Sequence, residues 1–170
     1  MDLNELESII TKIPDFPKPG ILFYDISPVL NDANAFSFVT EKIENKIKKY
    51  NVDTIAAIDA RGFIFGAAVA QKMNRGLTMI RKIGKLPGKI IKKSYKLEYG
   101  TNTLEVNPLY LKGNVALIDD LLATGGTANA SIDLIKESGA DVVCFCTVIE
   151  LEFLSGKNNL NIPYESIIKY

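Results

Sequence analysis

The sequence predicts an α/β protein with a mostly parallel central sheet flanked by helices. Short apolar runs alternate along the chain with segments of helical periodicity, which is the pattern of βαβ units around a parallel sheet. The chain has 170 residues, of which 47% are hydrophobic, and this is enough for one compact domain with a substantial core. Because no repeat or Pro/Gly-rich linker divides the chain, we expect a single domain over residues 1–170.

The individual elements follow from their own patterns. Apolar residues spaced three and four apart predict an amphipathic helix over 34–50. The expected strands, each a short apolar run, are 54–58, 77–80, 115–118, 142–149 and a last edge strand at 164–170. The expected further helices are 63–73 and 127–138, the second of which is ended by Gly139.

Two regions do not follow this alternation. Residues 13–25 are too rich in proline for a core element and predict an extended cover. Residues 83–108 form a long, non-periodic insertion between two predicted strands. Long loops inside compact domains are usually lids or binding loops.

Composition excludes several classes of partner and chemistry. Lys+Arg and Asp+Glu each total 20, so the bulk charge gives no sign of nucleic-acid or acidic-membrane binding. The chain contains no histidine, which removes His-based nucleophile pairs, general bases and metal ligands. Any bound metal should therefore be a hard, oxygen-ligated ion such as Mg²⁺.

The cysteines and the N-terminal residues predict the compartment. Cys144 and Cys146 share one face of a predicted buried strand, where reduced core thiols are the favoured interpretation. The N-terminus lacks the order of charged and apolar residues found in signal peptides, and the longest apolar run is too short to cross a bilayer. We therefore expect a soluble, cytoplasmic protein.

The most informative segment is 115–127. An apolar strand ends at two adjacent carboxylates, Asp119 and Asp120, and a Thr/Gly-rich turn then opens the next helix. The turn consists of Ala123, Thr124, Gly125, Gly126 and Thr127. Its backbone N–H groups and hydroxyls can converge on one anion at the helix N-terminus, while the carboxylates can accept hydrogen bonds from vicinal hydroxyls or hold a hydrated divalent cation. The segment predicts a receptor for a ribose 5-phosphate group.

Two familiar phosphate-binding motifs do not fit this segment. The P-loop motif is absent, and the acids precede the glycines, whereas a dinucleotide fold has its acidic residue after them. An ordinary strand end and helix cap is the plain alternative, but two neighbouring buried carboxylates repel each other and would be costly without a ligand.

A second anion site is predicted around Arg61. Asp59, Ala60, Arg61 and Gly62 follow the predicted strand 54–58, and ligands bind at this edge of open parallel sheets. The alternative is that Arg61 caps the turn or pairs locally with Asp59. Two anion sites with ribose-binding carboxylates between them call for a sugar substrate with separated phosphate groups.

A cluster of basic residues surrounds the start of the insertion. Its members are Arg75, Arg81, Lys82, Lys85, Lys89, Lys92, Lys93 and Lys96. Such a run is most often a solvated basic loop, and a nucleic-acid face is a second possibility, although aromatic residues are sparse in it. We favour a third, a basic lid that binds a polyanionic small substrate and excludes water.

Taken together, these residues resemble the adenine phosphoribosyltransferases, a branch of the type I phosphoribosyltransferase family. The resemblance covers nearly the whole chain and is carried by residues 16–23, 25–30, 60–66, 81–88, 97–100 and 115–127. Lys-Leu-Pro-Gly at 85–88 and Leu-Glu-Tyr-Gly at 97–100 are specific to the adenine branch. The resemblance implies the type I phosphoribosyltransferase fold, with a small N-terminal hood at about 1–33 and a long flexible lid loop at about 83–108.

The resemblance also implies an activity. Adenine and 5-phosphoribosyl 1-pyrophosphate would form AMP and pyrophosphate through an oxocarbenium-like transition state. Mg²⁺ would be held mainly by substrate and water rather than by a direct protein ligand. The protein would be a homodimer in which Arg81 reaches the neighbouring site.

Finally, the resemblance implies a role for each site residue. The 5-phosphate would be bound by Ala123, Thr124, Gly125, Gly126 and Thr127, and the ribose hydroxyls by Asp119 and Asp120. Pyrophosphate would be bound by Asp59, Ala60, Arg61, Arg81 and Lys85, with the 59–60 peptide often cis in the family. The expected catalytic residues are Glu98, Arg61 and Lys85. Adenine would contact Leu22, Phe23, Tyr24 and Leu151, and Tyr99 would help to close the lid.

Tyr24 departs from the family pattern. Many members of the family have arginine at this position, and tyrosine cannot offer the same fork of donors; Ala60, where serine is frequent, is a smaller change. A phosphoribosyltransferase for another purine therefore stays open as an alternative function. A second alternative, of a different class, is a regulator that binds phosphoribosyl pyrophosphate without turning it over.

Overall fold

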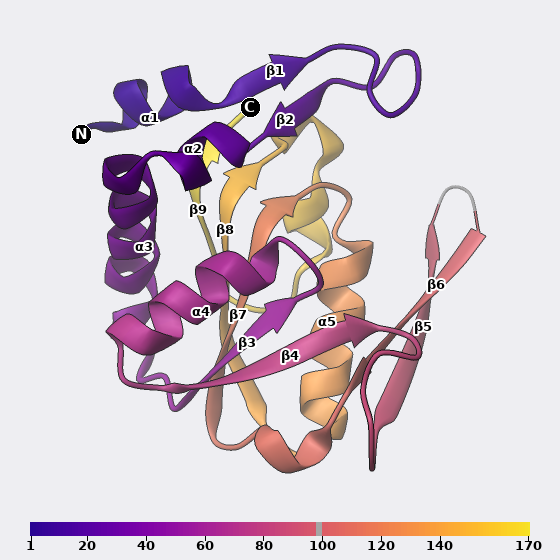
Figure 1. The fold of residues 1–170 in the computed structure, drawn as a ribbon. Helices are drawn as coiled ribbons and strands as arrows, with labels where there is room; N and C mark the ends of the chain where they lie inside the picture. Colours follow the sequence, from indigo (N-terminus) through magenta and orange to yellow (C-terminus); the bar gives the residue numbers. More distant parts are fainter. Residues whose placement is uncertain (98–99) are drawn as a thin grey trace. The chain divides into compact units, whose positions relative to one another are not determined.

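The computed structural model describes residues 1–97 and 100–170. These form two compact units, Met1–Lys42 and Ile43–Tyr170, which are described separately (Figure 1). The prediction of one domain with a hood at about 1–33 stays a prediction. In the described part of the chain, no helix combines the length and the hydrophobicity needed to cross a bilayer.

The first unit contains short elements joined by loops. They are α1 (Leu3–Ile9), β1 (Thr11–Ile13), β2 (Phe23–Asp25), α2 (Ser27–Asn31) and the first part of α3 (Ala33–Ile47). β1 and β2 pair antiparallel, with Thr11 opposite Asp25. The extended cover predicted for 13–25 is therefore partly a β-hairpin, whose long connection between β1 and β2 holds the prolines.

The second unit is built on a seven-stranded sheet in the order β5-β6-β4-β3-β7-β8-β9. The strands are β3 (Thr54–Ile58), β4 (Gly76–Lys82), β5 (Ile91–Leu97), β6 (Gly100–Val106), β7 (Asn114–Leu122), β8 (Asp141–Glu150) and β9 (Tyr164–Lys169). Strands β4, β3, β7, β8 and β9 run parallel, which confirms the predicted mostly parallel sheet and its edge strand β9.

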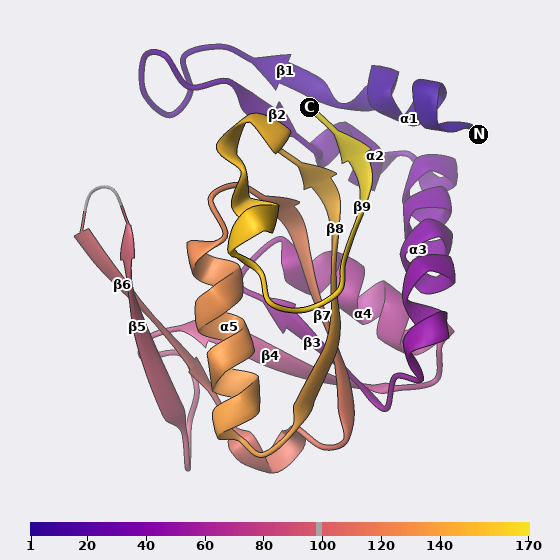
Figure 2. The same ribbon diagram turned by 180° about the vertical axis from the view of Figure 1, so that it is seen from behind.

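Helices cover both faces of this sheet. α4 (Gly62–Lys72) connects β3 to β4, and α5 (Gly126–Glu137) connects β7 to β8. These two crossovers proceed in opposite directions along the sheet, so the right-handed rule puts their helices on opposite faces. Figures 1 and 2 show α4 in front of the sheet in one view and α5 in front in the other. Short 3-10 turns, η1 (Lys48–Tyr50), η2 (Pro108–Tyr110), η3 (Glu152–Leu154) and η4 (Gly156–Asn159), complete the unit.

The prediction that 83–108 is one non-periodic loop was wrong in its secondary structure. β5 and β6 form an antiparallel hairpin with Ile91 opposite Val106, and β6 joins the sheet through antiparallel pairing with β4. Ile91 and Tyr95 pack against the core. Lysines occupy most of the other positions of β5, so the alternation expected of a half-buried strand is obscured.

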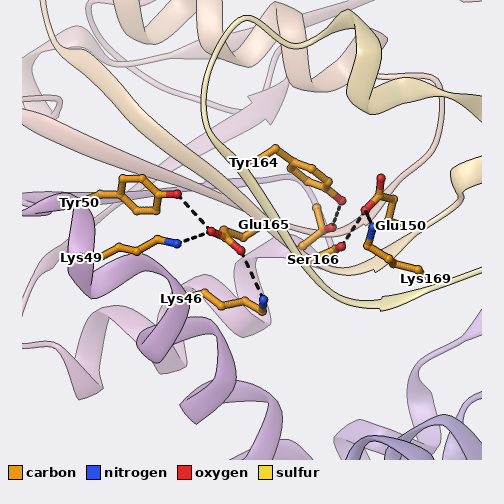
Figure 3. A network of polar contacts seen from close by, with 9 residues as sticks. Lys46, Lys49, Tyr50, Glu150, Tyr164, Glu165, Ser166 and Lys169 are labelled. Atoms are coloured by element: carbon orange, nitrogen blue, oxygen red, sulfur yellow. Dashed lines mark hydrogen bonds and ion pairs between the residues drawn. The ribbon is translucent and has the colours of Figure 1, made fainter.

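The edge strand β9 is held by a polar network around Glu165 (Figure 3). The donors to its carboxylate are Lys49 Nζ at 2.6 Å, Tyr50 Oη at 3.1 Å and Lys46 Nζ at 3.3 Å. Burial alone would raise the pKa of Glu165, but these donors lower it overall. Ser166, the residue after Glu165, donates to the buried carboxylate of Glu150 at 2.7 Å. Lys169, at the other end of β9, lies 3.6 Å from the same oxygen, so both ends of the strand are fixed.

Helix α4 packs directly on the central strand β3. Every residue of β3 is buried, and Gly66 of α4 lies against Ala57, where an added Cβ would come within 2.5 Å of the Ala57 Cβ. This close approach fixes the distance between α4 and the sheet, and with it the position of the turn that precedes α4.

We expect Gly66→Ala to destabilise the protein by about 1–3 kcal/mol, the usual cost of overpacking a core, although alanine is the better helix former. Denaturant unfolding would measure the loss. Gly76→Ala is the matched control, because a Cβ at Gly76 meets nothing within 4 Å. Equal effects of the two substitutions would contradict the packing argument.

Candidate functional site

A cavity of about 480 Å³ opens at the carboxyl ends of β3 and β7. Its lining residues are Ile58, Asp59, Ala60, Arg61, Lys82, Tyr95, Asn102, Leu104, Asp119, Asp120, Leu121, Leu122, Ala123, Thr124, Gly125, Gly126, Thr127, Ala128 and Phe145. All of them belong to the second unit. The structure therefore brings the two segments predicted to bind anions into one cavity, at the sheet edge where ligands of parallel sheets bind.

One side of the cavity is the turn from β7 into α5. Gly125 is the N-cap residue of α5 and has a φ of 87°, a left-handed conformation that favours glycine. The helix begins at the next residue, Gly126. Because the first N–H groups of a helix have no intrahelical partners, this turn presents donors and the positive end of the helix dipole. The arrangement can bind a phosphate.

The two adjacent carboxylates lie inside β7 rather than at its end, because the strand continues to Leu122. Asp120 is buried and Asp119 is half-buried, and the Asp120 N–H donates to Asp119 Oδ1 at 2.9 Å. Burial and the charge of Asp120 raise the pKa of Asp119 well above its usual value. Burial also raises the pKa of Asp120, against the opposing effect of Arg61.

Arg61 contacts one of these carboxylates. Its Nη2 lies 2.8 Å from Asp120 Oδ2, so the alternative of a purely local pairing with Asp59 does not account for its position. Asp59 instead lies 3.3 Å from Arg81 Nε. The Asp59–Ala60 peptide is cis, as the resemblance led us to expect. A guanidinium at this place can bind an anionic ligand beside the carboxylates.

Gly62 belongs to the turn predicted around Arg61, but its packing role is visible only in the structure. A Cβ at Gly62 would lie 2.8 Å from Asp119 Oδ1 and 3.0 Å from the Ile118 carbonyl oxygen. Only a residue without a side chain allows the start of α4 to approach β7 so closely. The glycine directly after the arginine of the strand-end turn was the signal in the sequence.

The basic residues of the predicted lid do not all reach the cavity. Lys82 lines the cavity, whereas Arg81 and Lys85 are not among the lining residues. Arg81 contacts Asp59, and its Nη1 is 3.5 Å from the Lys85 carbonyl oxygen. The predicted roles of Arg81 and Lys85 stay predictions, and Lys82 is a candidate that sequence reasoning placed only in the basic cluster.

The backbone that holds Lys85 is fixed by a buried carboxylate. Glu105 Oε1 accepts hydrogen bonds from the N–H groups of Lys85 at 2.6 Å and Leu86 at 2.7 Å. Burial alone would raise the pKa of Glu105, but the N–H groups of Gly84, Leu86 and Lys85 lower it overall. The loop after β4 is therefore anchored on the buried carboxylate of Glu105, which lies on β6 opposite the end of β4.

Tyr95 connects the hairpin to the turn at the start of α5. It lines the cavity from β5, and the Thr127 hydroxyl donates to its Oη at 3.1 Å. Sequence reasoning missed Tyr95, because a loop is expected where the hairpin lies. Glu98 and Tyr99, predicted to act in catalysis and in closing the lid, lie outside the described residues.

The residues predicted to contact adenine belong to different units. In the first unit Leu22 is exposed and Tyr24 is buried, while Phe23 packs edge-to-face against Phe16 with ring centroids 5.1 Å apart. In the second unit Leu151 is buried, directly after β8. These roles stay predictions.

Comparisons with known proteins agree with the resemblance. The sequence profile of the family described as phosphoribosyl transferase domain matches residues 28–159. The chain is 49% identical to the adenine phosphoribosyltransferase of Mycoplasma mobile over 99% of each chain. Among solved structures, that of adenine phosphoribosyltransferase from Thermoanaerobacter pseudethanolicus is 42% identical with a TM-score of 0.96, covering 99% of this chain and 100% of the other. The Saccharomyces cerevisiae enzyme, in complex with an imino-altritol bisphosphate and adenine, is 32% identical with a TM-score of 0.94, covering 98% of each chain.

We expect Asp119→Asn to raise the melting temperature at pH 8. Folding raises the pKa of this carboxyl, so the wild-type protein loses stability as pH rises from the unfolded pKa, about 4, towards the folded pKa. The asparagine side chain does not titrate, so the variant does not lose this stability. Thermal unfolding between pH 4 and 8 would show a gain that grows with pH.

Asp141→Asn serves as the matched control, because Asp141 is an exposed carboxyl on β8 and its amide should leave the pH dependence unchanged. A melting temperature of Asp119→Asn at or below wild type throughout this pH range would contradict the argument.

Proposed function

The chain belongs to the phosphoribosyltransferase family, in its adenine branch, and from this membership we propose that it transfers a phosphoribosyl group from 5-phosphoribosyl 1-pyrophosphate to adenine, forming AMP and pyrophosphate in purine salvage. The observation that carries this proposal is the single cavity that joins Asp119 and Asp120 to the turn at the start of α5. The turn offers donors for a 5-phosphate, and the carboxylates offer acceptors for the ribose hydroxyls, one turn away.

The proposed mechanism separates charge at the anomeric carbon. The bond from this carbon to the pyrophosphate oxygen breaks ahead of the bond to the adenine nitrogen, which leaves positive charge on the ribose ring. Asp119 and Asp120 are fixed negative groups beside that ring, and Arg61 and Lys82 are cations at the same cavity for the departing pyrophosphate. Fixed charges in a site that excludes water stabilise such a transition state effectively.

We assign Glu98 to the adenine end of the reaction, on the basis of the Leu-Glu-Tyr-Gly segment. A carboxylate there can accept the proton that adenine loses as its nitrogen bonds to the ribose, or orient that nitrogen. Arg81 and Lys85 are assigned to pyrophosphate on the same basis. The anchoring of the Lys85 backbone by Glu105 supports this assignment, because it fixes where the lysine side chain begins.

We propose Mg²⁺ as the metal cofactor, held mainly by the substrate and water. In residues 1–97 and 100–170 no group of three or more acidic or cysteine side chains is placed to hold a metal. The oxygen donors of Asp119 and Asp120 nevertheless suit a hydrated hard cation, so the residues present fit this ion. When bound, Mg²⁺ would neutralise negative charge on the pyrophosphate.

We also propose that the protein is a homodimer. Leu77 and Met79, two positions apart, lie on the same face of β4 and are 37% and 42% exposed. Ile64 of α4 is 40% exposed. Large exposed apolar side chains of this kind are typical of an interaction surface. Arg81 follows on the same face of β4, which suits the predicted reach of Arg81 into a neighbouring site.

We place the protein in the cytoplasm. Cys144 and Cys146 are buried free thiols, and burial raises the pKa of Cys144 to about 12. Unreactive reduced thiols in the core agree with a reducing compartment.

The base specificity is tested by assaying adenine, hypoxanthine and guanine side by side with phosphoribosyl pyrophosphate. We expect AMP formation from adenine to exceed turnover of the other bases by at least about 100-fold in kcat/KM, because a site built to hydrogen-bond one edge rejects another. Preference for hypoxanthine would show that Tyr24 has changed the specificity. Pyrophosphate release with none of the bases would favour a regulator that binds without turnover.

The role of Glu98 is tested by Glu98→Ala, which we expect to lower kcat by about 10²–10⁴-fold, the usual contribution of a general acid or base. Glu41→Ala, at an exposed glutamate of α3, is the control and should keep wild-type turnover. Wild-type kcat in Glu98→Ala would remove Glu98 from the mechanism.

A further inference from the structure

The turn that lines the phosphate side of the cavity is supported from outside by the segment Gly156–Asn159, which is η4. In Figures 1 and 2 this gold segment lies beside the start of α5 in both views. The Asn159 side-chain amide donates from Nδ2 to the Thr124 carbonyl oxygen at 3.0 Å. The Cα of Gly156 lies directly against the Ala123 carbonyl oxygen, so a Cβ there would collide with it. Two consecutive carbonyl groups of the turn thus face the same support.

The orientation of these carbonyls fixes the direction of two N–H groups. In a trans peptide the C=O and the following N–H point to opposite sides, and neither peptide is among the cis bonds of the described chain. The N–H groups of Thr124 and Gly125 therefore point away from η4. Both residues line the cavity, and successive N–H groups with a common direction make an anion-binding concavity.

Asn159 is itself fixed to the helix that the turn opens. Its backbone carbonyl oxygen accepts a hydrogen bond from Asn129 Nδ2, on α5, at 3.1 Å. A Cβ at Gly125 would lie 2.9 Å from the Gly156 carbonyl oxygen, so the turn and its support are in contact through two glycines. Since glycine peptides rotate with little steric restriction, the turn needs an external hold to keep one orientation.

We propose that Asn159 is a positioning residue for 5-phosphate binding. It holds the Thr124–Gly125 peptide so that the N–H group of Gly125 is directed at the phosphate before the ligand arrives. Asn159 is not a cavity-lining residue and acts only through the turn. The inference rests on the proposed function, because that function supplies the 5-phosphate. A preorganised donor improves binding because the ligand does not have to order it.

The test measures binding of two ligands to the full chain by calorimetry. Ribose 5-phosphate reports on the 5-phosphate site, and pyrophosphate reports on the site around Arg61. We expect Asn159→Ala to weaken ribose 5-phosphate binding by about tenfold, the effect of roughly one hydrogen bond, and to leave pyrophosphate binding within about twofold. In turnover, KM for phosphoribosyl pyrophosphate should rise while KM for adenine stays unchanged.

Two further variants sharpen the result. Asn159→Asp keeps the size of the side chain but replaces the donor by a carboxylate facing the Thr124 carbonyl, so it should bind ribose 5-phosphate at least as weakly as Asn159→Ala. Asn158→Ala is the matched control, because Asn158 is an exposed neighbour in η4, and it should behave as wild type. Melting temperatures establish that each variant is folded.

The outcomes separate this inference from the proposed function. Unchanged ribose 5-phosphate binding in folded Asn159→Ala would overturn the inference alone, and so would an equal loss of binding for both ligands. If Asn159→Ala does not fold, Asn159→Asp decides by the same criteria, and failure of both to fold would overturn the inference in favour of a purely structural role. A wild-type protein that binds no ribose 5-phosphate would overturn the proposed function and this inference with it.

Discussion

The rest of the site depends on two adjacent carboxylates held in a poorly solvated place. Asp119 and Asp120 repel each other, and burial raises the pKa of both. The main compensation within the cavity is the ion pair of Asp120 with Arg61. This arrangement costs stability in the absence of ligand, and such costs are typical of sites built for binding and catalysis. Folding therefore does not explain the pair, whereas the proposed function supplies a ligand that would use both carboxylates.

The parallel sheet explains how distant segments meet at these carboxylates. β3 and β7 pair with Ala57 opposite Ile118, so the turn after β3 arrives beside Asp119. Gly62 then allows α4 to begin against β7 without a side chain between them. The register of β3 against β7 and the close approach at Gly62 therefore place Arg61, the carboxylates and the turn at the start of α5 around a single cavity.

The sequence was sufficient for the features that depend on local pattern. Buried parallel strands appear as apolar runs, and the two segments with anion-binding patterns follow such runs, so the core sheet and the main lining segments of the cavity could be predicted. The hairpin β5–β6 could not, because the lysines of β5 interrupt its apolar alternation. The approach of Gly62 to Asp119 and the hydrogen bond of Asn159 to Thr124 could not be predicted either, because each joins residues that are distant in sequence.

The hydroxyl of Thr127 links the hairpin to the turn at the start of α5. Thr127 has one hydroxyl proton, and in this structure it is donated to Tyr95. An anion that accepts this proton at the turn would remove the hydrogen bond that the Tyr95 oxygen accepts. Ligand binding at the turn would therefore change a contact of β5. Because Tyr95 also lines the cavity, this hydrogen bond links the position of the hairpin to the turn at the start of α5.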